Sequence, residues 1–227
     1  MGGGMTDIAL YDLDRTITRR ATYTPFLLHA AWRHERWRLV LVPAVIASML
    51  AYVVGLVDRG RLKEINHGLM IGPKIAPEKL AQLAESFAEA TLARNVYPQA
   101  LARIAADRAA GRRLVLATAS YTFYALPIAR RLSFDDVIGT ASERDGEGAI
   151  LARIDGENCY GKAKRLMLDD WLSRQSIARD GVRVRFYSDS SSDLPVFDWS
   201  DEPIATNPSS KLRKIADRRG WEIIAWG

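Results

Sequence analysis

The second half of the chain alternates between short apolar runs and amphipathic segments, and this alternation restricts the fold more than any other feature. The apolar runs have the length and the bounding turn residues of strands, and the segments between them have helical spacing. Such alternation predicts an α/β fold, in which a parallel sheet carries helices on both faces. We predict strands at 8–11, 113–118, 137–140, 182–188, 204–206 and 221–226, and helices at 121–132, 161–174 and 209–219.

Residues 20–95 interrupt this alternation. Their pattern is helical throughout, with no strand signal, and they lie between the first strand and all the others. We therefore expect two domains. Residues 1–19 and 96–227 would form a Rossmann-like core, and residues 20–95 an inserted all-helical cap.

Within the expected cap, residues 39–57 form a run of 19 residues without a charge, which is long enough for a membrane span. Connectivity excludes a single crossing, because the strands before and after the run must join one sheet. Two alternatives remain. The run is either a re-entrant or surface-lying hairpin on the inner face of an anionic membrane, or it is buried in the cap or in a dimer contact. Its basic flanks are Arg33, Arg36, Arg38, Arg59, Arg61 and Lys63.

Composition excludes several classes of protein. Hydrophobic residues make up 48% of the chain and charged residues 26%, as in an ordinary globular protein. The net charge of +5 is modest and the arginines are scattered, so nucleic acid is not expected as a partner. The single cysteine, Cys159, allows no intramolecular disulfide, and no zinc-like cluster surrounds the three histidines. Without a signal-peptide pattern at the start, these features predict a cytoplasmic protein.

Four separated pieces of the sequence place polar groups at predicted strand ends or at a helix start. Open α/β sheets bind ligands at the carboxyl ends of their strands, so these pieces are expected to converge. Carboxylates there can hold a divalent cation, and hydroxyl and ammonium groups can bind a phosphoryl group. Each piece alone is also typical of a turn or a solvated loop, but four in this order favour a phosphate site. They are Asp12 with Asp14, Thr118 with Ser120, Lys164 or its neighbour Lys162, and Asp189 with Asp193.

These motifs resemble those of the haloacid dehalogenase (HAD) superfamily of phosphohydrolases, in the phosphoserine-phosphatase-like branch (subfamily IB) with a helical C1 cap after the first strand. The resemblance covers nearly the whole chain. It includes DLDRT at 12–16, LATAS at 116–120, GKAK at 161–164 and YSDSSSDLP at 187–195, which are similar to the first to fourth motifs of the family in that order.

The resemblance implies hydrolysis through an aspartyl phosphate. Asp12 is then the nucleophile, and Asp14 is the general acid and base. Lys164 is expected to neutralise charge at the nucleophile, and Thr118 and Ser120 to hold the phosphoryl group. The implied cofactor is Mg²⁺, with ligands from Asp12, the backbone carbonyl of Asp14 and Asp189, while Asp193 either orients these ligands or binds the ion directly.

Two positions depart from the family pattern. Arg15 stands where relatives generally carry Gly or Ser, and its side chain either reaches the substrate phosphate or points to solvent; we favour solvent. Ala21 stands where relatives often carry an acidic residue, which in phosphoserine phosphatases holds the amino group of the substrate. Phosphoserine is therefore a poor match.

Three functions stay open on this resemblance. The apolar cap with basic flanks is similar to that of bacterial phosphatidylglycerophosphate phosphatases of this branch and indicates a phosphorylated lipid head group. The alternative enzyme is a soluble phosphatase of phosphorylated small molecules. The third function is a non-catalytic phospho-acceptor module similar to a receiver domain, which would need neither Asp14 nor a large cap.

Overall fold

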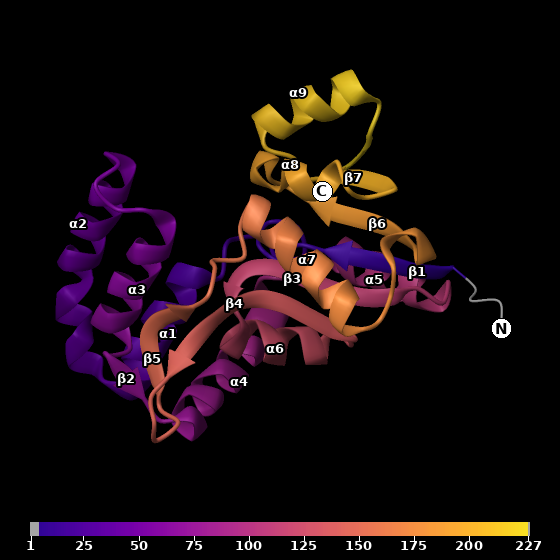
Figure 1. Ribbon diagram of the computed structural model, residues 1–227. Coiled ribbons are helices and arrows are strands. Elements are labelled where there is room, and N and C mark those ends of the chain that lie inside the picture. The colour runs from indigo at the N-terminus through magenta and orange to yellow at the C-terminus, as the bar shows by residue number, and fades with distance from the viewer. Residues whose placement is uncertain (1–4, 227) are drawn as a thin grey trace.

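The computed structural model describes residues 5–226, and within this range one sheet of eight strands forms the centre of the molecule (Figure 1). The strands are β1 (Thr6–Tyr11), β2 (Lys74–Ile75), β3 (Arg113–Tyr121), β4 (Asp136–Arg144), β5 (Ile150–Asp155), β6 (Val182–Ser188), β7 (Glu202–Thr206) and β8 (Glu222–Ile224). Their order is β2-β5-β4-β3-β1-β6-β7-β8. All pairs from β4 to β8 along this order are parallel, which confirms the predicted α/β fold.

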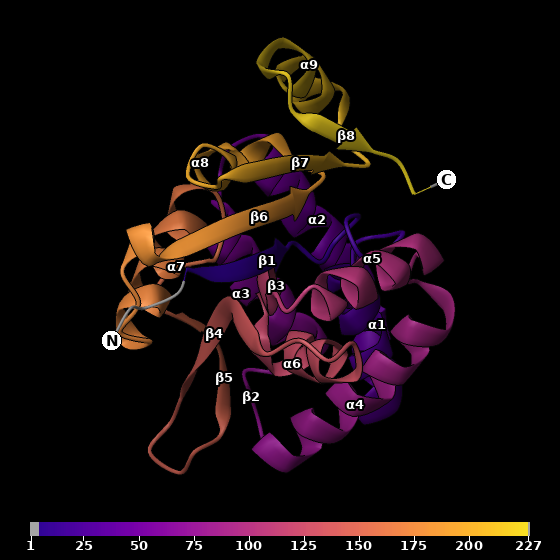
Figure 2. The same cartoon turned by 90° about the vertical axis from the view of Figure 1, so that its right-hand side faces the viewer.

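Helices cover both faces of the sheet. The helices are α1 (Tyr23–His34), α2 (Val42–Val53), α3 (Arg59–Met70), α4 (Pro77–Arg94), α5 (Pro98–Ala109), α6 (Thr122–Arg131), α7 (Lys162–Arg174), α8 (Leu194–Phe197) and α9 (Ser210–Arg219), with 3₁₀ segments η1 (Arg36–Leu41), η2 (Arg179–Gly181) and η3 (Ser191–Asp193). Successive side chains of a strand point to opposite faces. In β1, Tyr11 therefore packs with α4, α5 and α6, seen together in Figure 2, whereas Leu10 packs with α7, α8 and α9.

The last helix shows how local sequence sets these boundaries. Ser209 precedes α9 and accepts a hydrogen bond from the backbone N–H of Leu212, as an N-cap does. Gly220 ends the helix at a φ of 66°, a left-handed conformation that glycine adopts without a steric penalty. Both boundaries confirm the prediction from sequence.

The sheet also contains antiparallel strands that the alternation did not predict. β5 pairs with β4 and β2 pairs with β5, both antiparallel. The prediction that residues 20–95 contain no strand is thus wrong at β2. A two-residue strand carries no periodicity of its own, and β2 exists only because β5 offers it an edge.

The helices between β1 and β3 pack in two separate places. α4 packs along α6 beside the sheet, and the hydrophobic core there includes Leu83 and Phe87 of α4 with Tyr124 and Ile128 of α6. α2 and α3 pack against each other at one end of the sheet, on the left in Figure 1. The division into a core and a cap at residues 20–95 stays a prediction.

The uncharged run lies largely on the surface. η1 and α2 join end to end over Arg36–Val53, and only 11% of this stretch is buried. It is long and apolar enough to cross a membrane, but β1 before it pairs with β3 after it, so a single crossing would break the sheet. The alternative of burial inside the cap is wrong for most of the run. Lys63, assigned from sequence to its basic flank, is instead buried.

Candidate active site

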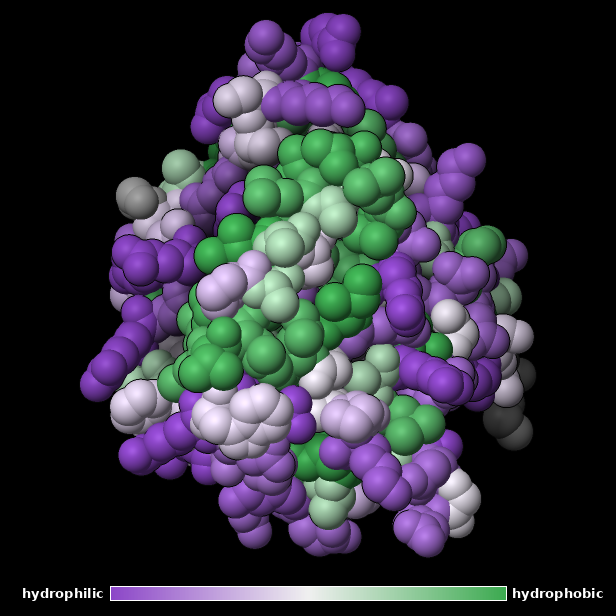
Figure 3. All heavy atoms as spheres, turned by 90° about the vertical axis from the view of Figure 1, so that its left-hand side faces the viewer, coloured by the Kyte–Doolittle hydropathy of each residue, from purple (hydrophilic) through white to green (hydrophobic). Residues whose placement is uncertain are grey.

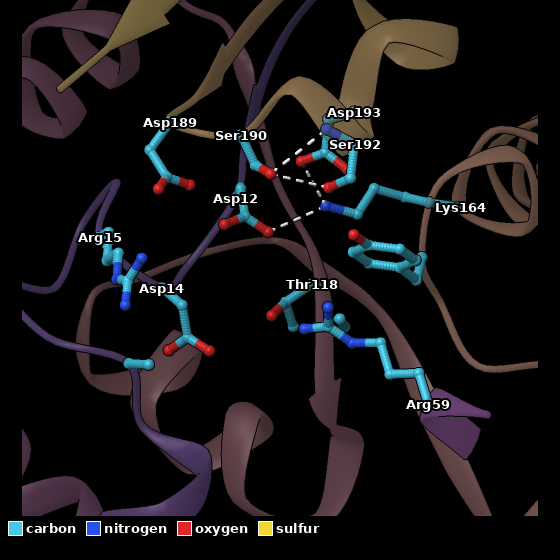
Figure 4. Close-up of a pocket in the computed structure, with 13 residues that line it drawn as sticks. Asp12, Asp14, Arg15, Arg59, Thr118, Lys164, Asp189, Ser190, Ser192 and Asp193 are labelled. Carbon is cyan, nitrogen blue, oxygen red and sulfur yellow. Dashed lines mark hydrogen bonds and ion pairs between the residues drawn. The ribbon is translucent and has the colours of Figure 1, made fainter. Parts of the chain in front are cut away.

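The predicted site residues meet where the central strands end. In the sheet register, Tyr11 at the end of β1 is level with Leu116 of β3 and Tyr187 of β6. Residues that follow these positions therefore share one edge of the sheet, where α/β folds bind ligands. They surround a cavity of about 250 Å³ (Figure 4). Its lining includes Asp12, Asp14, Thr118, Lys164, Asp189 and Asp193.

Lys164 supplies the buried positive charge of this cavity. From the first turn of α7, its Nζ donates to Oδ1 of Asp12 at 2.9 Å and to Oδ2 of Asp193 at 2.8 Å. Burial alone lowers the pKa of Lys164, but the two carboxylates outweigh burial and hold the pKa above its usual value. The ammonium group therefore stays charged. Lys162 is exposed, so the geometry favours Lys164 of the two lysines.

Asp14 is held separately, by the segment that leads into α1. Thr22 donates its backbone N–H at 2.8 Å and its hydroxyl at 2.7 Å to Oδ1 of Asp14. The hydroxyl of Ser120 lies 3.4 Å from Oδ2. Burial raises the pKa of Asp14, although the hydrogen bonds from Thr22 lower it. A carboxyl group with a raised pKa can hold and release a proton closer to neutral pH.

The side chains of Thr118 and Ser120 line two different cavities. The pairing between β3 and β4 is irregular between Ala117 and Tyr121, as in a β-bulge. Thr118 lines the cavity beside Asp12, and its Oγ1 accepts a hydrogen bond from the backbone N–H of Ser120 at 3.1 Å. Ser120 lies beside Asp14 and lines a second cavity. A phosphate contact by Ser120 stays a prediction, without support from this geometry.

The oxygen donors of the cavity suit Mg²⁺. Figure 4 shows the carboxylates of Asp12 and Asp189 turned into the same space. Burial and the neighbouring Asp193 raise the pKa of Asp189 to about 6, so a cation here would relieve the crowding of negative charge. Oδ1 of Asp193 is buried and has no hydrogen-bond partner among residues 5–226.

Across the same residues, no three Asp, Glu, His or Cys side chains come together as a complete set of metal ligands. Mg²⁺ does not require such a set, because the ion keeps several waters and takes only one or two carboxylates from a protein. Asp12 and Asp189 are the side chains best placed to hold it, with the backbone carbonyl of Asp14 as the further ligand that the resemblance implies.

Arg15 is exposed to solvent, as expected, and it also lines the cavity. Its φ of 61° lies in the left-handed region, where relatives can use a glycine. Asn207 fixes this turn by donating from Nδ2 to the carbonyl of Arg15 at 3.2 Å. In Figure 4 the guanidinium group lies between Asp14 and Asp189.

Two cationic residues of α3 also reach the site, and the sequence did not single them out as site residues. Arg59 lines the cavity, with its guanidinium carbon 4.1 Å from the ring centre of Tyr160. Lys63 donates from Nζ to Oδ1 of Asn158 at 2.8 Å and to the backbone carbonyl of Ala119. Burial lowers the pKa of Lys63 to about 7, and the nearby charge of Arg59 adds to this effect. These partners lie far away in sequence, so no local motif could reveal them.

A second cavity of about 280 Å³ continues from Asp14 toward α2 and α3. Its walls are mostly apolar and aromatic, formed by Tyr23, Met49, Tyr52 and Leu62. Asn66 also lines it, and its Nδ2 is buried without a hydrogen-bond partner among residues 5–226. The cavity therefore offers an apolar wall next to Asp14, together with donors from Arg59, Lys63 and Asn66.

Comparison with protein families decides the class of this site. The profile of the haloacid dehalogenase-like hydrolases matches residues 9–198, which include all four motifs. The chain belongs to this family. Membership in the HAD hydrolases confirms the predicted family and the prediction of an enzyme, and it removes the non-catalytic module from consideration.

Relatives of this HAD hydrolase agree with a phosphatase. The histidinol-phosphatase of Neisseria meningitidis is 25% identical over 152 residues, which cover 66% of this chain and 68% of the relative. The phosphoserine phosphatase SerB1 of Mycobacterium tuberculosis is 27% identical over 227 residues, which cover 96% of this chain and 70% of the relative. These findings confirm the prediction of a phosphatase. The resemblance to phosphatidylglycerophosphate phosphatases stays a prediction.

A solved structure also matches the HAD hydrolase over nearly its full length. A protein of unknown function from Bordetella pertussis has a TM-score of 0.89 and 28% sequence identity, with 98% of this chain and 100% of that chain covered. The helices around the uncharged run are therefore part of a shared architecture.

Proposed function

We propose that this chain is a Mg²⁺-dependent phosphomonoesterase that acts through an aspartyl phosphate on Asp12. One observation carries the proposal: Asp12 is paired with a buried ammonium group, Lys164, while Asp14 is held apart by Thr22 at the same cavity. A nucleophile beside a fixed cation, with a separate acid–base group, matches the requirements of phosphoryl transfer from an ester.

The proposed reaction has two steps. First, a carboxylate oxygen of Asp12 bonds to phosphorus while the bond from phosphorus to the ester oxygen breaks, and Asp14 gives its proton to the departing alkoxide. Next, Asp14 takes a proton from a water molecule, whose oxygen attacks phosphorus and releases Asp12 and inorganic phosphate. Lys164 offsets the repulsion between carboxylate and phosphate, and Thr118 donates to a phosphoryl oxygen. Mg²⁺, when bound, would neutralise further negative charge.

The substrate that we propose is a phosphorylated small molecule. The named relatives act on phosphoserine and on histidinol phosphate, which are both phosphate esters of small alcohols. Ala21 lines the phosphate cavity where an acidic residue would hold a substrate amine, so phosphoserine itself is disfavoured. Arg59 and Arg15 add positive charge to the cavity, which favours an ester with a second anionic group.

Turnover of p-nitrophenyl phosphate with Mg²⁺ tests this proposal. We expect Asp12→Asn to lower kcat more than about a thousandfold, because no phosphoenzyme can form. Asp14→Asn should still form a phosphoenzyme from this ester, whose leaving group needs no proton, but should hydrolyse it slowly. Asp217→Asn, at an exposed position of α9, is the matched control. Near wild-type turnover by Asp12→Asn would exclude the proposed nucleophile.

A second candidate substrate is a phosphorylated lipid head group such as phosphatidylglycerophosphate. The apolar second cavity supports it, because Met49 and Tyr52 of α2 line a path from Asp14 toward the exposed face of that helix. A panel of phosphorylated metabolites and lipids, assayed with and without detergent micelles, separates the two substrate classes. Preference for a lipid phosphate by a large margin in kcat/KM would replace the small-molecule proposal. A cytoplasmic location is proposed in either case.

A further inference from the structure

The outer face of α2 is apolar and exposed over its full length. Ile46, Leu50 and Val53 follow each other at helical spacing, and Leu50 is 60% and Val53 76% exposed. The turn after the helix adds Leu56, which is 78% exposed. Figure 3 shows this area as one broad hydrophobic surface bordered by hydrophilic side chains. Monomeric proteins rarely expose a continuous apolar surface of this kind without a partner.

Charge around the face points to an anionic partner. Between residues 33 and 61 the chain carries five arginines and only two acidic residues. Both acidic groups are engaged locally: Glu35 pairs with Arg38 at 2.6 Å, and Asp58 accepts the backbone N–H of Arg61 at the start of α3. Arg61 also pairs with Glu64 at 3.1 Å, so the excess positive charge lies at the end of the face that precedes α2, where Arg33 and Arg36 are exposed.

Two exposed tryptophans precede α2. Arg36 stacks on Trp32 with its guanidinium carbon 4.6 Å from the ring centre, and Arg38 stacks on Trp37 at 4.8 Å. Tryptophan prefers the boundary between membrane and water, and arginine binds the phosphate groups found there. An apolar face with Trp–Arg pairs at one end has the side chains of an interfacial helix.

We propose that the outer face of α2 binds the surface of an anionic lipid bilayer. The helix lies on the bilayer and does not cross it, because a single crossing would separate β1 from β3, which pair in one sheet. A second copy of this chain fits the face less well, since pairing like faces would bring two arginine-rich borders together. The surface goes beyond the proposed function, because a face remote from the reacting groups can bind lipid whether or not the site hydrolyses phosphate.

Co-sedimentation of the full chain with lipid vesicles tests this surface. We expect binding to vesicles that contain phosphatidylglycerol, much weaker binding to phosphatidylcholine vesicles, and loss of binding at high salt. Leu50→Asp/Val53→Asp should lower the bound fraction at least tenfold. The control Leu101→Asp/Leu126→Asp adds the same charge at exposed leucines of α5 and α6 and should bind like the wild type.

Activity and oligomeric state separate the remaining outcomes. All variants should keep turnover of p-nitrophenyl phosphate, because none of the substituted residues lines the active-site cavity. Unchanged turnover shows that the site is intact. A loss of lipid binding in such a variant then reports on the surface and not on the proposed reaction. Equal vesicle binding by Leu50→Asp/Val53→Asp would overturn the proposal. A wild-type dimer that ignores vesicles and becomes monomeric in this variant would also overturn it and would assign the face to a second copy.

Discussion

Lys164 connects the stability of the fold to the chemistry of the site, and Lys164→Met separates the two. The wild-type ammonium group contacts Asp12 at 2.9 Å and Asp193 at 2.8 Å, and its side chain is 2% exposed. Methionine has a similar length and no charge, so the variant leaves two buried carboxyl groups without a cation. We expect loss of activity together with a large loss of stability.

The size of the stability loss follows from protonation. A buried carboxylate that loses its cation takes up a proton instead of remaining charged. At pH 7, about 3 pH units above the ordinary carboxyl pKa, this costs about 4 kcal/mol. The raised pKa makes the folded variant bind more protons than its unfolded chain, so its deficit shrinks by about 1.4 kcal/mol for each pH unit between pH 7 and pH 5. Removing the second carboxylate with Lys164→Met/Asp193→Asn should restore most of the stability but not the activity.

Urea unfolding at pH 5, 6 and 7, in EDTA so that no cation replaces the lysine, measures these differences. The exposed Lys162→Met is the matched control and should change stability by less than about 0.5 kcal/mol. Equal stability of Lys164→Met and the wild type at pH 7 would refute the ion-pair argument. A greater loss of turnover in Lys162→Met than in Lys164→Met would assign the catalytic cation to the other lysine.

Three further predictions concern the fold and the metal. Burial lowers the pKa of His67 to about 4, so stability should fall by about 3 kcal/mol as pH drops from 6.5 to 4, and urea titrations of His67→Phe should lack this component. Asp107 accepts from Tyr11 at 2.6 Å and from Arg185 at 2.8 Å, so Asp107→Asn should cost about 3 to 5 kcal/mol in urea unfolding; a loss below 1 kcal/mol would contradict this. EDTA should abolish turnover, and Asp189→Ala should raise the Mg²⁺ concentration needed for half-maximal activity at least tenfold; activity that persists after chelation would exclude the metal.

The sequence predicts that the residues of the first cavity come together, because they are local signals at strand ends. Asp12 and Asp189 each follow an apolar strand, Thr118 follows the apolar run within β3, and a parallel sheet brings such positions to one edge. Lys164 begins a helix at the same edge. Periodicity and topology are therefore sufficient to bring these groups together, and only the distances required a structure.

The burial of Lys63 and the strand β2 could not be predicted in this way. As a basic residue after an apolar run, Lys63 has the sequence context of a solvated or membrane-flanking charge. Its burial depends on acceptors such as Asn158, which is 95 residues away in sequence. β2 depends in the same way on the edge of β5. Tertiary contacts decide both features, and local propensity carries no trace of them.

α2 and α3 combine two surfaces with opposite chemistry. On α3, Lys63 and Asn66 are buried at the cavities, and the hydroxyl of Ser48 in α2 donates to Oδ1 of Asn66 at 2.6 Å. Leu50 and Val53 of α2 face outward. Substitutions on the inner surface should therefore change kcat/KM without changing vesicle binding, and those on the outer surface should do the reverse. If both surfaces changed together, the helix pair would instead couple lipid contact to the site, because its position would then depend on both.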